Sequence, residues 1–587
     1  MEISIKHVLI ILFILGLSIR YHASVYNLIP ERDSITAFDE TVSMLIAIGT
    51  VSSPWQRLST LYHGPIYFYL TDIGYKLFGV TYAGARLFST ILSTTSIALV
   101  YLLAREFYGK RIALFSAAIF TISSAQILLG TLALYEPLYT AFILASLLSF
   151  VRWIRSSGQY YLFASVAFFV VAFNTKIIVF YLLPIYAYYL LSRKKRIARG
   201  DTKYLLLAAI MLVFLLLLLP IPTYNFLLYM DKGIIDLNLA RTFNLSQPLN
   251  YFRDMHLALA DTPWLQPDIG SSAVAFAGYF ISIFSPAFIF LALAGTYAML
   301  SKRTPADFFV LLWFGVPVFL YILLTFHLYY LVFLVPPFAI MAARGIEYIA
   351  VKVPPIEKKL FVFILFALLV ANELLILAEF TKDKSTIYKL KEFVAKIPTD
   401  AILLSDPKII NLQAFWLFEG LSGQSAQYFT YQKNELYKYT NATDDVFADM
   451  YYITCELENC GLDVANLADV KELSDTYKEE IISKGLLVTE IYENGLLAHR
   501  IYRTKVAFPH ALPFYLKNYI FYGYRIDMPE FSQDVYDIPS GFPSFLNILA
   551  HLSLLVNLIF ALSMPFLALY LLHKEPDEKI RSVLKSW

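Results

Sequence analysis

Charged residues and cysteines are both scarce in this chain. Only 16% of its 587 residues are Asp, Glu, Lys or Arg, whereas a soluble globular protein carries about 25%. The 47 basic and 45 acidic residues nearly balance, and no Lys/Arg cluster resembles a nucleic-acid footprint, so we expect no nucleic-acid partner. The only cysteines are Cys455 and Cys460. They form a local disulfide if their segment lies outside the cell, or are ordinary buried residues if it does not.

Long apolar runs, in contrast, are abundant. Hydrophobic residues make up 58% of the chain, and apolar runs of about 20 residues are typical of transmembrane helices. The sequence therefore predicts a polytopic α-helical membrane protein surrounded by membrane lipids, with about twelve transmembrane helices. We expect these spans near residues 7–23, 81–103, 112–130, 138–154, 160–173, 177–192, 204–222, 273–300, 307–325, 329–346, 358–378 and 544–572.

Basic residues predict the orientation of the spans. In a count of twelve, every second loop is rich in Lys and Arg, and cytoplasmic loops carry this excess. The basic segments are 105–111, 152–155, 193–199, 302–303, 344–352 and 574–585. We therefore expect both termini to be cytoplasmic in a multi-pass protein of the cell membrane.

The same count places three long segments outside the cytoplasm. They are a first loop at 24–80, a second loop at 223–272 and a small extracytoplasmic α/β domain at 380–543. The chain is thus divided into a membrane domain at 1–379, the α/β domain, and a last span with a basic tail at 544–587.

The α/β domain is predicted from short periodic segments. Asn494-Gly495 between two apolar runs is a strong hairpin signal. The segments are a helix at 389–396 and strands at 401–405, 450–454, 488–492 and 496–500.

Asp39 and Glu40 form an acidic pair shortly after the first span. Carboxylates are costly near a bilayer, so a pair at its outer edge suggests chemistry there. Transfer of a sugar to a hydroxyl or amine needs a base for the acceptor's proton, which one carboxylate supplies while its neighbour orients a substrate. The alternative is that Asp39 simply caps a helix.

Three cationic or ionisable residues are candidates for holding a leaving phosphate. They are His63 in His63-Gly64-Pro65, Lys176 in a predicted outside turn, and Arg86 near the outer end of a span. A cation or hydrogen-bond donor stabilises such a leaving group as its bond breaks. The alternatives are a plain helix-start turn at His63 and a snorkelling anchor at Lys176.

Further candidates lie in other predicted outside segments. Glu136, in the turn at 131–137, is either a second site carboxylate or an exposed loop acid. His327, Tyr329 and Tyr330 open a late span. They line either a lipid-head pocket or an interfacial aromatic belt.

These motifs together resemble the GT-C glycosyltransferases. The series is Phe38-Asp39-Glu40, His63-Gly64-Pro65-Ile66-Tyr67, Leu77-Phe78-Gly79 and Ala85-Arg86-Leu87, followed by His327 to Pro337 and Ala342-Ala343-Arg344-Gly345. The groups it resembles most are the protein O-mannosyltransferases and the bacterial lipid A aminoarabinose transferases. The resemblance covers roughly residues 1–350.

The resemblance implies an inverting transfer from a polyprenyl-phosphate sugar (dolichyl or undecaprenyl) to a glycan, protein or lipid acceptor outside the cytoplasm. It implies that Asp39 is the base or positions the acceptor, that Glu136 supports the site, and that Tyr67, His327, Tyr329 and Tyr330 line the lipid and sugar pocket. The chain has no Trp-Trp-Asp signature of oligosaccharyltransferases. It also has no dense acidic site, so we expect no obligatory divalent metal and no other cofactor.

Two alternatives remain open from the sequence. A transporter or lipid flippase without transferase activity would have broken helices and polar groups at the bilayer midplane; the predicted spans are largely free of charge, with Glu373 the main exception. A non-catalytic scaffold that presents the outside domain would tolerate a change at Asp39.

Overall fold

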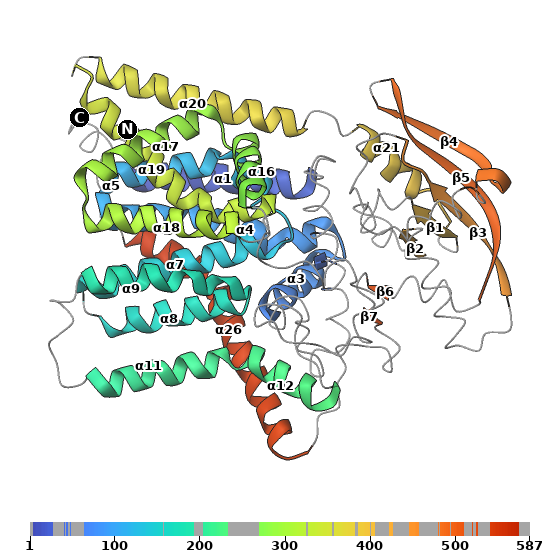
Figure 1. Cartoon of the computed structure of the whole chain (residues 1–587), viewed down its shortest axis with the longest axis horizontal. Coiled ribbons are helices and arrows are strands. Elements are labelled where there is room, and N and C mark those ends of the chain that lie inside the picture. The colour runs from blue at the N-terminus through green and yellow to red at the C-terminus, as the bar shows by residue number, and fades with distance from the viewer. Residues whose placement is uncertain are drawn as a thin grey trace.

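The computed structural model is mostly helical, with a five-stranded sheet beside the helices (Figure 1). Its helices are α1 (Ile5–Tyr26), α3 (Pro65–Phe78), α4 (Tyr82–Tyr108), α5 (Lys110–Ile122), α6 (Ser124–Leu128), α7 (Tyr135–Ser156), α8 (Gln159–Phe173), η1 (Ile177–Leu182), α9 (Leu183–Ser192), α11 (Lys203–Leu218), α12 (Pro220–Lys232), α16 (Ile269–Ile283), α17 (Pro286–Lys302), α18 (Pro305–Leu323), η2 (Leu328–Leu334), α19 (Val335–Val351), α20 (Lys358–Thr381), α21 (Ser385–Val394) and α26 (Phe542–His573). The structure describes residues 4–26, 40, 43–44, 47, 64–156, 158–192, 203–232, 269–323, 327–354, 357–381, 385–398, 401–405, 422–425, 445–456, 479, 482–493, 495–509, 519–520, 524–525 and 540–574.

Seven helical segments of the described chain have the length and composition of membrane-crossing helices, or eight if one bent pair is a single span. This makes the chain a multi-pass membrane protein, but the predicted count of twelve is not confirmed. The shortfall arises because several predicted spans are interrupted or short. The seven segments are Ile5–Val25, Tyr82–Tyr108, Tyr135–Ser156, Pro305–Leu323, Leu328–Val351, Lys358–Ala378 and Phe542–His573.

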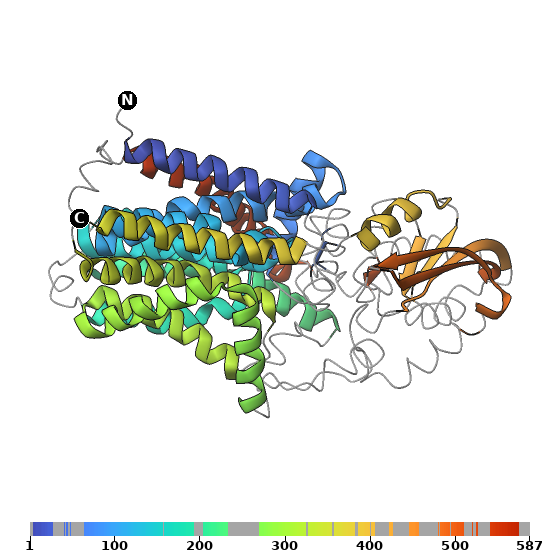
Figure 2. The same ribbon diagram turned by 90° about the horizontal axis from the view of Figure 1, so that it is seen from above.

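The span expected at 273–300 is the bent pair. Helices α16 and α17 meet at an angle of 113°, and α16 runs across the long helices in the view from above (Figure 2). The side chain of Ser285 accepts a hydrogen bond from the backbone N–H of Phe288, and Pro286 follows it. A Ser cap followed by Pro at the first helical position begins a new helix, which explains why the apolar run does not continue straight.

The span expected at 112–130 is also interrupted, between α5 and α6. Arg20 of α1 donates hydrogen bonds to the carbonyl oxygens of Phe120 and Thr121, both at 3.2 Å, at the end of α5. Glu373 of α20 accepts a hydrogen bond of 2.6 Å from the backbone N–H of Ser124, where α6 begins. A cation at a helix C-terminus and an anion at an N-terminus both stabilise the freed backbone groups. The break is thus capped on both sides by buried charges.

The sheet has five strands in the order β2-β1-β3-β5-β4. The pairs of β1 with β2 and β3 are parallel, and those of β5 with β3 and β4 are antiparallel. Its core is made by side chains of α21 and the strands, including Leu390, Val394 and Leu403. The strands are β1 (Ile402–Ser405), β2 (Ser422–Ser425), β3 (Asp445–Ile453), β4 (Leu486–Glu493) and β5 (Leu496–Pro509), and a separate ribbon pairs β6 (Tyr519–Ile520) with β7 (Tyr524–Arg525).

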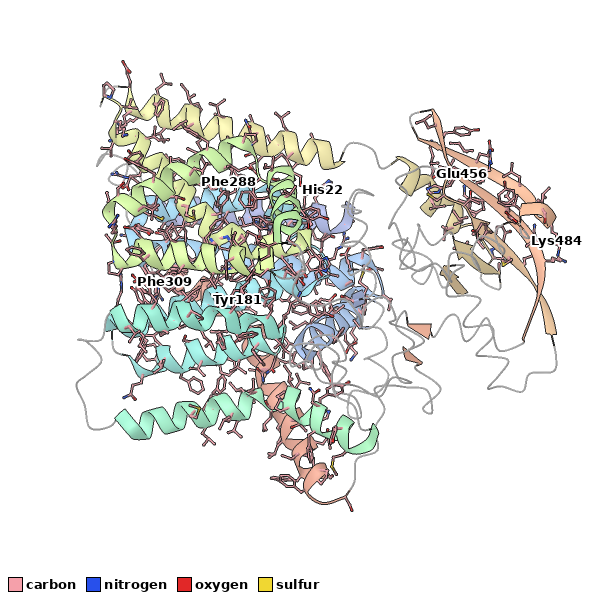
Figure 3. All side chains as sticks on the ribbon, viewed as in Figure 1. His22, Tyr181, Phe288, Phe309, Glu456 and Lys484 are labelled. Carbon is pink, nitrogen blue, oxygen red and sulfur yellow. The ribbon has the colours of Figure 1, made fainter. Side chains whose placement is uncertain are left out.

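The predicted elements of the outer segment coincide with observed ones. The predicted helix overlaps α21, and the four predicted strands fall on β1, β3, β4 and β5. Gly495 in the predicted hairpin has φ +82°, the conformation that favours glycine in such turns. Cys455 is disulfide-bonded; Cys460 lies outside the described residues. Figure 3 labels Glu456, after β3, and Lys484, before β4, and it labels Tyr181, Phe288 and Phe309 within the helical bundle.

Candidate functional site

A buried ion pair connects Glu40, within the first predicted outside loop, to Arg86 of α4. Arg86 donates from Nε and Nη2 to the two carboxylate oxygens of Glu40, each at 2.6 Å. Its third nitrogen, Nη1, donates to the carbonyl oxygen of Ser24 at 3.0 Å. Side chains of both partners are almost completely buried. This bidentate geometry is the strongest form of an Arg–carboxylate contact.

The turn before α7 is attached to this pair. The backbone N–H of Ala133 donates to Glu40 at 2.7 Å, and its carbonyl oxygen accepts from the hydroxyl of Tyr67 at 2.6 Å. The rings of Tyr67 and Tyr135 lie 4.3 Å apart. Burial raises the pKa of Tyr67, so its hydroxyl keeps the proton that it donates. Glu40 and Tyr67 therefore hold the turn from which Glu136 projects.

Lys176 and Glu136 form a second buried ion pair. The Lys176 Nζ also lies over the rings of Tyr330, Tyr329 and Tyr135, at 4.4, 5.4 and 5.9 Å from their centroids. The Oε2 atom of Glu136 is buried and has no hydrogen-bond partner among the described residues. A lysine in an aromatic cage with a partly unsatisfied carboxylate is a polar centre with spare hydrogen-bonding capacity.

The start of α3 packs directly on the turn that carries Lys176. A Cβ atom at Gly64 would overlap the carbonyl oxygen of Asn174, and the backbone N–H of Ile66 donates to that oxygen at 3.4 Å. Pro65 is the first residue of α3. The close approach requires glycine at position 64.

His327 lies against the tyrosines of the same cage. Its ring is 5.4 Å from that of Tyr329 and 5.5 Å from that of Tyr330. Its Nδ1 atom is enclosed, with no hydrogen-bond partner in the described part of the chain. Burial, and secondly the charge of Lys176, lower the pKa of His327 to about 4. The imidazole is therefore neutral near pH 7 and offers one donor and one acceptor.

The structure brings most of the predicted site residues to one region. Contacts connect two groups, Glu40 with Arg86 and Tyr67, and Glu136 with Lys176 and its aromatic neighbours. Asp39 and His63 lie outside the described residues, and their roles stay predictions. The phosphate-binding role of Arg86 also stays a prediction, although its three guanidinium nitrogens already donate to Glu40 and Ser24.

Three contributors to this region were not predicted as site residues. Ala133 acts through its backbone, which no side-chain pattern reveals. Tyr135 precedes Glu136, and a tyrosine in so aromatic a chain gave no distinct signal. Asn174 was also missed, although an Asn between two apolar segments is costly to bury unless it is hydrogen-bonded.

The described residues offer no metal site. They contain no group of three or more His, Cys, Asp or Glu side chains that could hold a metal ion. Because Asp39 and His63 lie outside this set, the expectation that no divalent metal is required stays a prediction.

A family model covers part of the region that contains the site. Residues 62–219 match the model described as dolichyl-phosphate-mannose-protein mannosyltransferase. No curated protein matches the chain.

Solved structures with a similar fold cover most of the chain. The ArnT of Cupriavidus metallidurans bound to undecaprenyl phosphate is 14% identical, with a TM-score of 0.51; the match covers 84% of this chain and 97% of that one. The apo state of the same protein gives 13% identity, a TM-score of 0.50 and the same coverage. The resemblance to the GT-C glycosyltransferases is thereby confirmed: this chain shares the fold of ArnT, and its residues 62–219 match the mannosyltransferase model.

Proposed function

We propose that this chain is a membrane glycosyltransferase that moves a sugar from a polyprenyl-phosphate carrier (dolichyl or undecaprenyl) to an acceptor on the extracytoplasmic side. The observation that carries the proposal is the Lys176–Glu136 pair in its tyrosine cage, next to the Glu40–Arg86 pair. The fold shared with ArnT supports it, because one ArnT structure holds undecaprenyl phosphate. The acceptor is a glycan, a protein or a lipid.

The proposed reaction is a single inverting displacement. Asp39 accepts the proton of the acceptor hydroxyl or amine as that group bonds to the anomeric carbon. The bond between the anomeric carbon and the phosphate oxygen breaks at the same time, and the lipid phosphate leaves with the electron pair. Lys176 neutralises the leaving phosphate, assisted by His63.

Lys176 is suited to this role because the donor phosphate can replace Glu136 as its anionic partner. The donor phosphate takes over the contact that Glu136 makes now, and Glu136 then binds sugar or acceptor hydroxyls. Tyr67, His327, Tyr329 and Tyr330 line the pocket for the lipid head and sugar. Arg86 positions Glu40, since both carboxylate oxygens bind its guanidinium, and Glu40 fixes the turn that leads to Glu136.

The remaining features of the proposal follow the expected topology. Both termini are cytoplasmic, and the site faces the opposite side. The domain at 380–543 contacts the acceptor, while the membrane domain at 1–379 and the last span at 544–587 hold the lipid donor. No divalent metal is required.

The decisive experiment measures sugar transfer by purified protein from a polyprenyl-phosphate sugar to cell-envelope acceptors. Lys176→Met and Asp39→Asn should each lower the rate by at least about a hundredfold, as expected for loss of leaving-group stabilisation or of the general base. Lys302→Met, a change of an exposed lysine, is the matched control and should keep the normal rate. Unchanged transfer by Lys176→Met would refute the proposal.

A transporter or lipid flippase is a second candidate because two apolar segments are broken. The bend between α16 and α17 and the break between α5 and α6 both meet Glu373, and broken helices are common in transporters. Vesicles that contain the purified protein and a labelled polyprenyl-phosphate sugar separate the two functions. Movement of the label between leaflets without sugar transfer would favour the transporter.

A further inference from the structure

The last helix, α26, carries a buried polar residue that belongs to neither ion pair. Asn557 is completely buried, although the residues that α26 buries beside it are mostly small or apolar, such as Ala550, Ala561 and Ala568. Small residues are sufficient for close helix packing in a membrane. An amide there is costly unless it is hydrogen-bonded, so the partners of Asn557 define what it does.

One partner of Asn557 lies on α26 itself, where its Nδ2 donates to the carbonyl oxygen of Ser553 at 2.8 Å. Its other partners lie at the ends of two other helices. Asn557 Nδ2 donates to the carbonyl oxygen of Leu217 at 3.0 Å, and Oδ1 accepts from Asn174 Nδ2 at 3.3 Å. Asn174 Nδ2 also donates to Leu217, at 2.8 Å. Leu217 lies in the last turn of α11, where carbonyl groups lose their helical partners. The two amides thus join α26, the end of α8 and the end of α11.

Asn174 passes this constraint on to the candidate donor site. Its backbone carbonyl oxygen is covered by Gly64 and bonded by Ile66 at the start of α3. Two residues further along the same turn, Lys176 makes its contacts with Glu136 and the tyrosine cage. Asn557 thus contacts the residue that begins this turn from a position 383 residues away in sequence.

We infer that Asn557 is a positioning residue for the site that binds the donor phosphate, acting through Asn174 on the Lys176 turn and on the start of α3. This inference rests on the proposed function, because it assigns Lys176 to the phosphate. Through Asn557, helix α26 then contributes to the arrangement of the site. The family model ends at residue 219, so it does not include this contact.

Binding of the carrier tests the inference without need of the sugar or the acceptor. The probe is undecaprenyl phosphate, added to the purified full-length chain in detergent, with affinity read from the shift of the thermal midpoint. Asn557→Ala should weaken binding about ten- to hundredfold, since displacement of a positioned group by about 1 Å has effects of that size. Ser563→Ala, an exposed change on the same helix, should bind as the unmodified chain does.

A second comparison distinguishes positioning from general stability. In a Lys176→Met background, Asn557→Ala should cause no further loss of affinity, because the group that it positions is already missing. Asn174→Ala should reproduce the effect of Asn557→Ala. If Asn557→Ala fails to fold, Asn557→Ser, which places a shorter polar side chain with a hydroxyl at this position, replaces it and should give the same direction of change.

The outcomes separate this inference from the proposed function. If Lys176→Met weakens carrier binding and Asn557→Ala or its Ser replacement binds normally, Asn557 is only packing and the inference is wrong. An additive further loss in the Lys176→Met background also overturns it. If Lys176→Met itself binds normally, the proposed phosphate site is wrong.

Discussion

At the scale of single residues, opposite charges in the described site are matched within the protein before any substrate binds. Glu40 lies against Arg86, and Glu136 against Lys176. A buried ion pair adds little net stability, but removal of one partner leaves a costly unpaired charge. The pairs therefore fix the positions of these four side chains in the described site.

The Glu40–Arg86 pair leads to a stability prediction. Glu40→Gln should destabilise the protein by about 3–5 kcal/mol, because it leaves Arg86 buried without a counter-charge. The double variant Glu40→Gln/Arg86→Gln should lose less than the sum of the single changes. Thermal unfolding in detergent measures both. The exposed Arg155→Gln, whose partner Glu106 keeps Arg152, is the control and should cost about 0–1 kcal/mol.

His327 leads to a prediction about pH. Its pKa of about 4 in the folded protein lies below the ordinary 6.5, so the folded state resists protonation. Its stabilising effect is complete above about pH 6.5 and is lost as the pH falls toward 4. Between pH 6 and 8 the transfer rate should have the same pH profile in His327→Gln as in the unmodified chain. A step near pH 6.5 that vanishes in His327→Gln would contradict this.

At the scale of elements, close helix contacts depend on glycine as well as on apolar surface. Helices α17 and α19 cross where a Cβ at Gly295 would overlap the carbonyl oxygen of Met341, and one at Gly345 would overlap that of Leu291. Small residues allow such backbone approach between membrane helices. The α17–α19 pair continues to η2, which carries Tyr329 and Tyr330.

Gly345→Ala should therefore be strongly destabilising, whereas Gly315→Ala should not. At Gly345 the added methyl group forces two backbones apart, at a cost of about 1–3 kcal/mol. At Gly315 of α18 it meets no atom within 4 Å, and the helix propensity of Ala is higher. Unfolding midpoints of the two variants make a matched comparison; equal midpoints would mean that the glycine contact is not required.

At the scale of the whole molecule, Tyr82 connects the five-stranded sheet to the helical bundle. Its ring packs against the core of α21 and the sheet, and the guanidinium of Arg86 lies over it, 4.9 Å from its centroid. In Figure 1 this sheet lies beyond the end of the bundle that holds α3. Tyr82 therefore contacts both the core of this sheet and the Glu40–Arg86 pair.

Removal of the Tyr82 ring should lower the stability of the five-stranded sheet against local opening. Tyr82→Ala should increase hydrogen exchange of β1 and β3 severalfold, because the sheet loses its apolar contact with α4. Tyr82→Leu keeps apolar bulk and should restore most of the protection, but not the contact with Arg86. Tyr160→Ala, at a largely exposed position, controls for loss of a tyrosine and should leave exchange of the sheet unchanged. Equal exchange in Tyr82→Ala would show that the contact carries no stability.

Much of this protein was determined by the sequence alone, because the signals are local. Apolar runs predicted the helical membrane segments, and turn and strand patterns predicted the positions of α21, β1, β3, β4 and β5. The order of the acidic, His-Gly-Pro and tyrosine motifs indicated the GT-C resemblance, which the fold shared with ArnT confirms.

Tertiary structure decided what depends on distant partners. The break between α5 and α6 needs Arg20 and Glu373 to cap it, so a hydropathy pattern, which records only neighbouring residues, predicted one span there. The pairing of Glu40 with Arg86 and of Asn174 with Asn557 joins residues far apart in the chain. A buried charge or amide is stable only where another element supplies its partner, and only the folded chain brings that partner near.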